Sequence, residues 1–212
     1  MKTLAILSRK GGAGKTTVAL HLAVAARRRT VIMDCDPQKS AADWWRSRQA
    51  ETPELVEGGV GQLAEIQQAA AADGVELMVV DTRPSAEDDA LEAARAADLV
   101  LIVLKPTILD LRAVAATVDT VKAAGASAVF LINQAPAGRN GIEASIVQEA
   151  VEALAGYGLP ACPVVLHNRA SYHAALIDGR AVIEAEPSGK AANEIDALWA
   201  YVEKRLWQSA RR

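Results

Sequence analysis

Cysteine is scarce in this chain: Cys35 and Cys162 are the only two among 212 residues. They lie far apart in the sequence, without the C-x-x-C spacing that is typical of redox motifs and zinc sites. This spacing argues against a structural disulfide and against a metal cluster held by cysteine. We therefore expect two buried free thiols.

The chain also lacks a strong net charge and a long apolar run. Its 23 Lys and Arg residues and 26 Asp and Glu residues give a net charge of −3, so any binding to nucleic acid or anionic lipid needs a local basic patch. No uncharged apolar run approaches the ~18 residues that cross a bilayer, and the apolar stretch before Arg9 is too short for a signal peptide. We expect a cytoplasmic protein.

Hydrophobic residues make up 51% of the sequence, which suits one globular domain over residues 1–212. Short β-branched or leucine-rich runs alternate with Ala-rich segments of helical period, a pattern of βαβ units. The expected strands are residues 3–7, 30–34, 76–81, 99–104, 128–133 and 163–167. The expected helices are 15–28, 40–49, 61–72, 86–96, 109–124, 142–155 and 190–207. These elements predict a three-layer α/β fold with a mainly parallel twisted sheet.

A glycine-rich loop follows the first expected strand, where residues 9–17 read Arg-Lys-Gly-Gly-Ala-Gly-Lys-Thr-Thr. In a P-loop, glycines let backbone N–H groups turn toward phosphates, and the next helix points its positive end at them. Lys15 would then reach the β/γ-phosphates, and the Thr16 hydroxyl would hold Mg²⁺. The loop residues predicted to bind a nucleotide are Gly11, Gly12, Ala13, Gly14, Lys15, Thr16 and Thr17.

The loop departs from the common template G-x-x-x-x-G-K-[ST], because Arg9 stands where the first glycine belongs. It carries a second lysine, Lys10, five residues before Lys15. Two cations at close range repel each other, so we do not expect Lys10 to serve the same phosphates as Lys15. The motif favours a Lys10 that crosses to a nucleotide held by another subunit.

Carboxylates stand at the ends of two further expected strands. Asp81 can hold a water on Mg²⁺ from its strand tip, although a strand-end aspartate can also simply cap a loop. Asp34 and Asp36 leave three roles open: sharing the metal, positioning the attacking water, or forming a turn with Pro37. We assign the metal- and water-facing role to Asp36, which lies beyond the strand end, and expect Asp34 to support Mg²⁺ or the P-loop from behind. All three converge on the P-loop, because ligands bind at the carboxyl ends of parallel strands.

Residues 10–16, 34–38 and 81–84 together resemble the ParA/MinD family of deviant Walker A ATPases. The short chain is similar to the small ParA type typified by ParF, and the similarity continues through Arg169, residues 177–180 and Glu184. The chain departs from the family pattern at Arg83, where the family often has proline. That change leaves the metal-facing role of Asp81 intact but could alter the contact of this loop with a partner.

The resemblance implies an ATPase that binds ATP and Mg²⁺ and forms a nucleotide sandwich homodimer. Lys10 would contact the partner's nucleotide, Lys15 its own nucleotide, and Asp36 would be required for hydrolysis. Thr16, Asp36 and Asp81 would serve the metal. The ATP-bound dimer would bind nonspecific DNA on the nucleoid, and a centromere-binding or cargo adaptor protein would stimulate slow hydrolysis. Such a cycle segregates plasmid or chromosomal DNA, or positions another cargo.

Base and DNA contacts are also implied by the resemblance. Asn133 and Pro163 would contact the adenine, although Asn133 can equally be a turn residue. Arg169, Arg180 and Lys190 would bind DNA phosphates, which is a salt-dependent and sequence-independent interaction. Further cations gather near the end of the chain, at Lys204, Arg205, Arg211 and Arg212.

Two alternative functions remain. The last expected helix carries an apolar stripe that favours packing on the domain, although in a MinD-type membrane ATPase it would lie on a lipid surface. The stripe consists of Ile195, Leu198, Trp199, Val202 and Leu206. The other alternative is an ATP-dependent ligase related to dethiobiotin synthetase, in which Lys10 has no obvious use.

Overall fold

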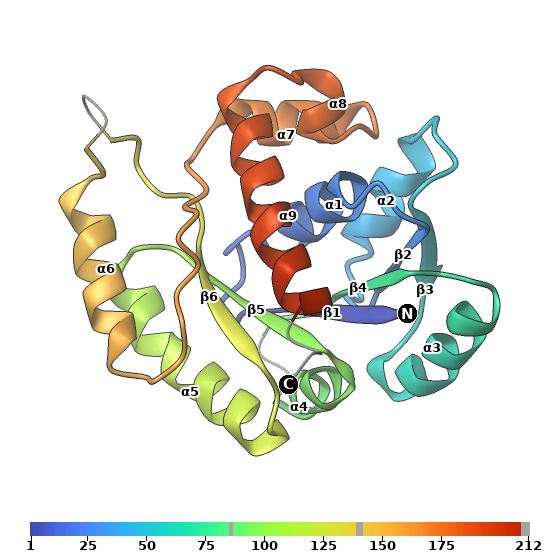
Figure 1. Cartoon of the computed structure of the whole chain (residues 1–212), viewed down its shortest axis with the longest axis horizontal. Helices are drawn as coiled ribbons and strands as arrows, with labels where there is room; N and C mark the ends of the chain where they lie inside the picture. The colour runs from blue at the N-terminus through green and yellow to red at the C-terminus, as the bar shows by residue number, and fades with distance from the viewer. Residues whose placement is uncertain (85–86, 139–141, 209–212) are drawn as a thin grey trace.

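The structure is a computed structural model that describes residues 1–84, 87–138 and 142–208 (Figure 1). Its described residues form a six-stranded parallel sheet in the order β3-β2-β4-β1-β5-β6. The strands are β1 (Lys2–Leu7), β2 (Thr30–Asp34), β3 (Glu54–Glu57), β4 (Leu77–Asp81), β5 (Leu99–Leu104) and β6 (Ala128–Ile132). The predicted α/β class with a parallel sheet is confirmed.

Helices cover both faces of the sheet (Figure 1). One face carries α1 (Lys15–Ala25), α2 (Ser40–Ser47), α7 (Ala170–Ile177), α8 (Val182–Ala185) and α9 (Lys190–Gln208). The other face carries α3 (Leu63–Ala72), which follows the short 3₁₀ helix η1 (Val60–Gln62), together with α4 (Glu87–Ala96), α5 (Ile108–Ala124) and α6 (Ser145–Ala155). These are the three layers that the sequence predicts.

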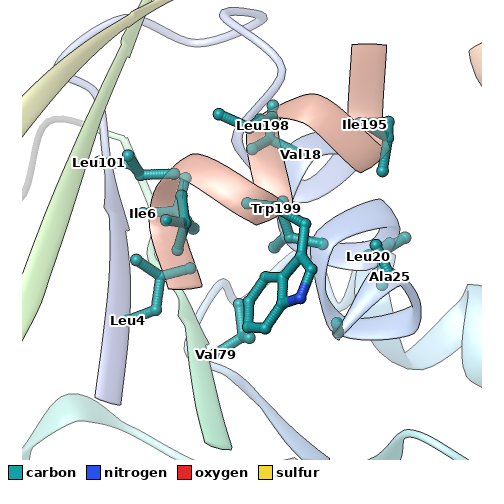
Figure 2. Packing of buried hydrophobic residues seen from close by; sticks show 14 of the residues in the cluster. Leu4, Ile6, Val18, Leu20, Ala25, Val79, Leu101, Ile195, Leu198 and Trp199 are labelled. Atoms are coloured by element: carbon teal, nitrogen blue, oxygen red, sulfur yellow. The ribbon is translucent and has the colours of Figure 1, made fainter. Parts of the chain in front are cut away.

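The core lies on both sides of the sheet because successive strand residues point to opposite faces. In β1, Leu4 and Ile6 pack under α1 and α9, whereas Ala5 and Leu7 pack under the helices of the other face. Figure 2 shows Leu198 and Trp199 of α9 gathered with residues of α1 and the sheet. The apolar stripe of the last helix is buried, as we expected from its spacing.

The strand predicted at residues 163–167 is wrong. This segment pairs with β6 and the residues after it only through isolated bridges, Phe130 with Ala161 and Ala135 with His167. Pro160 and Pro163 lack the N–H groups that a regular ladder needs. Conversely, the edge strand β3 was not predicted, because its four residues, Glu-Leu-Val-Glu, are too few to show a strand period.

Two expectations from what the sequence lacks are also tested. Cys35 and Cys162 are buried free thiols, and burial raises the pKa of both, that of Cys35 to about 12. Among the helices of the described segments, none has the length and apolar character needed to cross a membrane.

Candidate functional site

The glycine-rich loop connects the end of β1 to the first residue of α1, Lys15. Gly12 and Gly14 adopt positive φ angles of 73° and 93°, a backbone conformation that glycine enters without steric strain. A Cβ atom at Gly14 would lie 2.3 Å from Nδ2 of Asn133. The loop therefore needs glycine at position 14 both for its conformation and for this close approach.

Asn133 and Gln134, which follow β6, hold the loop from the side. The Asn133 amide donates a hydrogen bond to the carbonyl of Ala13 at 2.8 Å, and the Gln134 amide donates one to the carbonyl of Gly12 at 3.1 Å. The structure thus gives Asn133 a role that the sequence did not predict, as a support of the P-loop. Its adenine contact stays a prediction.

Pro163 and Asn133, the two predicted adenine contacts, line different hollows of the surface. Asn133 and Thr17 line one small hollow beside the P-loop. Pro163 lines a different groove, together with Val147 and Val151 of α6. The adenine contact of Pro163 therefore stays a prediction, as that of Asn133 does.

Lys15 and Asp81 form the buried centre of the site. Both side chains lie inside the protein at the carboxyl edge of the sheet, with Lys15 6% exposed and Asp81 fully buried. Burial lowers the pKa of Lys15, and the charges of Asp81 and Asp36 oppose this shift. Burial likewise raises the pKa of Asp81 to about 7, a shift that the side chain of Thr16 opposes.

The carboxylate of Asp81 fits a metal ligand. Within the described residues, neither of its oxygens has a hydrogen-bond partner of ordinary geometry, although Thr16 lies close enough to affect its pKa. A buried carboxylate without partners is strongly disfavoured. Mg²⁺ prefers oxygen ligands and usually binds through one or two carboxylates and substrate phosphates, so Thr16 and Asp81 are suitable residues to hold it.

Asp34 and Asp36 divide the roles that the sequence left open. Asp34 is buried and accepts hydrogen bonds from the backbone N–H groups of Asp36 and Ala42, each at 3.1 Å. It therefore supports the acidic loop and the start of α2, and the expected support of Mg²⁺ or the P-loop from behind stays a prediction. Asp36 is half-buried and raises the pKa of Lys15 through its charge. Its carboxylate accepts a hydrogen bond from the backbone N–H of Gln38 at 2.9 Å.

The second lysine of the loop lies apart from the first. Lys10 is more exposed than Lys15, and its Nζ atom lies 3.4 Å from Oδ2 of Asp110, in the first turn of α5. Its charge therefore faces a carboxylate of its own chain in this structure. The sequence did not predict this partner, although Thr107-x-x-Asp110 before an apolar run is a recognisable start of a helix.

The predicted DNA contact Arg169 is held inside an ion pair. Its Nε and Nη2 atoms donate to Oε1 of Glu194 at 2.9 and 2.6 Å. The same carboxylate accepts hydrogen bonds from Tyr172 and His167. The ion pair neutralises much of the charge that Arg169 would offer to DNA, and its DNA contact stays a prediction.

Arg180 and Lys190 are more accessible. Arg180 lies between α7 and α8, exposed, with Asp178 at 3.0 Å. Lys190 is the exposed first residue of α9. Lys204 and Arg205 lie near the end of α9, whereas Arg211 and Arg212 fall outside the described residues.

The comparisons with known proteins agree with this geometry. Residues 4–180 match the family model described as the CobQ/CobB/MinD/ParA nucleotide binding domain. Maintenance of carboxysome distribution protein A from Gloeobacter kilaueensis is 32% identical over 228 residues, covering 100% of this chain and 96% of the relative. Protein ParA from Rhizobium radiobacter is 28% identical and covers 72% of this chain and 75% of its own length.

A solved structure shows the same fold. The septum site-determining protein MinD from Pyrococcus horikoshii, complexed with Mg-ADP, matches with a TM-score of 0.73 at 18% identity. The match covers 100% of this chain and 99% of that one. With a family model that spans most of its length and the P-loop geometry that such a domain requires, this chain belongs to the CobQ/CobB/MinD/ParA family of nucleotide-binding domains.

Proposed function

We propose that this protein is a ParA-type ATPase that binds ATP and Mg²⁺, forms a nucleotide sandwich homodimer and hydrolyses ATP slowly. The observation that carries the proposal is the pair of lysines in one loop. Lys15 is buried beside Asp81, whereas Lys10 lies at the edge of the site with a side chain that is 37% exposed. This difference in exposure supports a role for Lys15 at the nucleotide of its own subunit and a role for Lys10 at the nucleotide of a second subunit.

The remaining residues fit phosphoryl transfer, which depends mainly on positioning and charge neutralisation. The loop from Gly11 to Gly14 turns backbone N–H groups toward the phosphates, and Lys15 neutralises their charge. Bound Mg²⁺ would supply charge to the β- and γ-phosphate oxygens, held through Thr16 and Asp81. Asp36, half-buried beyond the end of β2, would orient the attacking water.

The names of the relatives favour a cargo-positioning role. The G. kilaueensis relative is named maintenance of carboxysome distribution protein A, and the R. radiobacter relative is named protein ParA. We propose that the ATP-bound dimer associates with nonspecific DNA of the nucleoid. A cargo adaptor or a centromere-binding protein would stimulate its hydrolysis, and the cargo would be a protein assembly or a DNA molecule.

The membrane alternative is less well supported. A MinD-type surface helix needs an apolar face that is free to enter lipid, but Ile195, Leu198 and Val202 of α9 are fully buried in the protein core. The ligase alternative predicts ATP turnover that requires an acid substrate, an oligomeric state that ATP does not change and no role for Lys10. Both alternatives are outcomes of the test below.

The test is the oligomeric state measured by light scattering after size exclusion, with Mg²⁺ and either ATP, ADP or no nucleotide. We expect a dimer only with ATP. Lys10→Ala should bind ATP as a monomer but weaken the dimer by at least about tenfold, since a charge-assisted contact to phosphate is lost at both sites of the dimer. Lys122→Ala, which removes an exposed lysine at the other end of α5, is the matched control and should dimerise normally.

A wild-type protein that stays monomeric with ATP would contradict the proposal. So would a Lys10→Ala variant that dimerises as tightly as wild type. Sedimentation of the ATP-bound protein with liposomes, in the absence of any retention on random DNA, would favour the membrane alternative instead.

A further inference from the structure

The contact between Lys10 and Asp110 concerns a residue to which the proposed function gives no role. Asp110 lies in the first turn of α5, and its side chain is only 8% exposed. Its Oδ2 atom accepts a hydrogen bond from the hydroxyl of Thr107 and lies 3.4 Å from Nζ of Lys10. The lysine that distinguishes this loop thus faces a buried carboxylate of its own subunit.

Asp110 is fixed in place by the start of α5. Thr107 caps the helix, and its hydroxyl oxygen accepts a hydrogen bond from the backbone N–H of Asp110 at 3.3 Å. The same hydroxyl donates to the Asp110 carboxylate. A carboxylate held by a helix cap cannot follow a departing lysine, so the contact breaks when Lys10 moves away.

Breaking this contact is unfavourable because it leaves a buried carboxylate without its cationic partner. Because Asp110 is 8% exposed and Lys10 is 37% exposed, the loss is smaller than for a fully buried ion pair and larger than for a pair of exposed side chains. We propose that Asp110 restrains Lys10 within its own subunit, so that Lys10 crosses to a second subunit only when the nucleotide bound there replaces Asp110. This inference rests on the proposed ATP-dependent dimer.

The restraint would sharpen the response to ATP. A triphosphate offers Lys10 more negative charge than one carboxylate does, and charge-assisted hydrogen bonds to phosphate are strong. A diphosphate lacks the γ-phosphate and offers less. Asp110 would therefore hold the ADP-bound and nucleotide-free subunits apart, while it raises the protein concentration at which the ATP dimer forms.

Another role for Asp110 predicts the opposite effect. If Lys10 kept its contact with Asp110 while it touched the partner's nucleotide, Asp110 would orient Lys10 in the dimer. Loss of Asp110 would then weaken the dimer instead of strengthening it. The sign of the change separates a restraint from a support.

The first measurement concerns the subunit alone, without nucleotide. Acetic anhydride at trace concentration labels Lys10 at a rate that mass spectrometry can follow, and an ion pair slows this labelling because it holds the amine against the Asp110 carboxylate and away from the reagent. We expect Asp110→Asn, which keeps the hydrogen bond to Thr107, to label Lys10 about threefold faster. Asp119→Asn, which removes an exposed carboxylate of the same helix, should leave the rate unchanged.

The second measurement is the dimer dissociation constant with ATP and Mg²⁺, from analytical ultracentrifugation. A symmetric dimer breaks two Lys10–Asp110 contacts, so a threefold effect at each site gives Asp110→Asn a dissociation constant about tenfold lower. Its ADP-bound form should also begin to dimerise. The ATP affinity of the isolated subunit should stay the same, because the restraint acts through Lys10 on the partner's nucleotide.

The outcomes are distinct. An unchanged labelling rate would overturn the restraint whatever the oligomeric state. A weaker dimer in Asp110→Asn would also overturn it, and so would a tighter dimer that is explained entirely by tighter ATP binding to the single subunit. By contrast, a wild-type protein without any ATP-dependent dimer would overturn the proposed function itself.

Discussion

Burial separates two lysines that are chemically identical. Lys15 is buried near Asp81, and this burial lowers the pKa of Lys15. Lys10 keeps more contact with solvent and faces Asp110. Their difference in role therefore follows from where the fold places each ammonium group, and only the spacing of the two lysines was visible in the sequence.

His21 shows how a buried titratable residue links stability to pH. It lies within α1, fully buried, where its Nδ1 atom accepts a hydrogen bond from the backbone N–H of Val182 at 3.1 Å. Its Nε2 atom lies 3.3 Å from the carbonyl of Tyr172. Burial lowers the pKa of His21 from 6.5 to about 4, so the native protein keeps this ring neutral.

The unfolded chain binds a proton at His21 between these two pKa values, whereas the native protein does not. The free energy of unfolding should therefore fall as the pH decreases from about 6.5 to about 4. We expect this one group to remove about 2 kcal/mol between pH 7 and pH 5. Urea unfolding at both pH values measures the loss.

The control separates His21 from the other groups that titrate in this range. His21→Gln should be less stable at pH 7 but should lose about 2 kcal/mol less on acidification than wild type. His173→Gln, at an exposed position of α7, should retain most of the wild-type dependence, because burial lowers the pKa of His21 more than the charge of His173 does. Equal losses in wild type and His21→Gln would show that this ring does not titrate as inferred.

At the scale of elements, the segment between α7 and α8 is fastened to α2. Arg48, which ends α2, donates to the carbonyl of Gly179 at 2.8 Å and forms a bidentate pair with Glu184. The Trp44 indole donates to the carbonyl of Arg180 at 3.3 Å. The exposed Arg180 side chain therefore projects from a backbone that several contacts hold in place.

Gly179 makes this attachment possible, and its replacement should disrupt it. Its φ is 68°, and a Cβ atom would lie 2.4 Å from the backbone nitrogen of Arg48. Gly158 has a similar φ of 74° but open space around it. Gly158→Ala should lower the free energy of unfolding by about 1 kcal/mol, the cost of a left-handed residue. Gly179→Ala should lower it by on the order of 2 kcal/mol more, because the backbone of Arg48 must also shift.

Urea unfolding of the two alanine variants gives this difference directly. Because both variants carry the same change of side chain at a similar backbone angle, conformational strain cancels and the clash with Arg48 remains. Equal losses of stability would mean that the segment around Gly179 moves away from α2 freely.

The sequence predicted the elements well where the hydrophobic pattern was long and regular. The strands β2 and β5 have the expected bounds, and α5 begins one residue earlier than expected. The pattern failed for short elements: β3, α7 and α8 were not predicted. They are short, and tertiary contacts such as the bridge from Arg48 to Glu184 position α8 without any local sequence signal.

Across the whole molecule, the convergence of the P-loop, Asp34 and Asp81 could be predicted from topology. Parallel strands bring their carboxyl ends to one edge, and Asp34 and Asp81 are indeed register partners in β2 and β4. The partners of Lys10 and Arg169 could not be predicted in this way. Asp110 and Glu194 come from helices far along the chain, and their meeting depends on how those helices pack.

The ion pair of Arg169 with Glu194 leaves Arg180 and Lys190 as the more accessible cations of the proposed DNA surface. With a net charge of −3, the chain must bind DNA through local cations, and Arg169 is held by Glu194. Arg169→Glu would place two carboxylates together and would disturb the fold as well as any DNA contact. Arg180 and Lys190 are exposed, and Arg180 shares only an exposed pair with Asp178, which is of small energy.

Arg180→Ala and Lys190→Ala should therefore each weaken retention of the ATP-bound dimer on random-sequence DNA. The plot of log affinity against log salt has a negative slope. Each lost phosphate contact makes this slope less steep by about 1, or by about 2 in a symmetric dimer that uses both copies. Arg95→Ala is the matched control, since Arg95 is an exposed residue of α4, on the other side of the molecule from α7 and α8 (Figure 1). Binding measured between about 50 and 200 mM salt should show wild-type slopes for Arg95→Ala only. Unchanged slopes for both Arg180→Ala and Lys190→Ala would place the DNA surface elsewhere on the dimer.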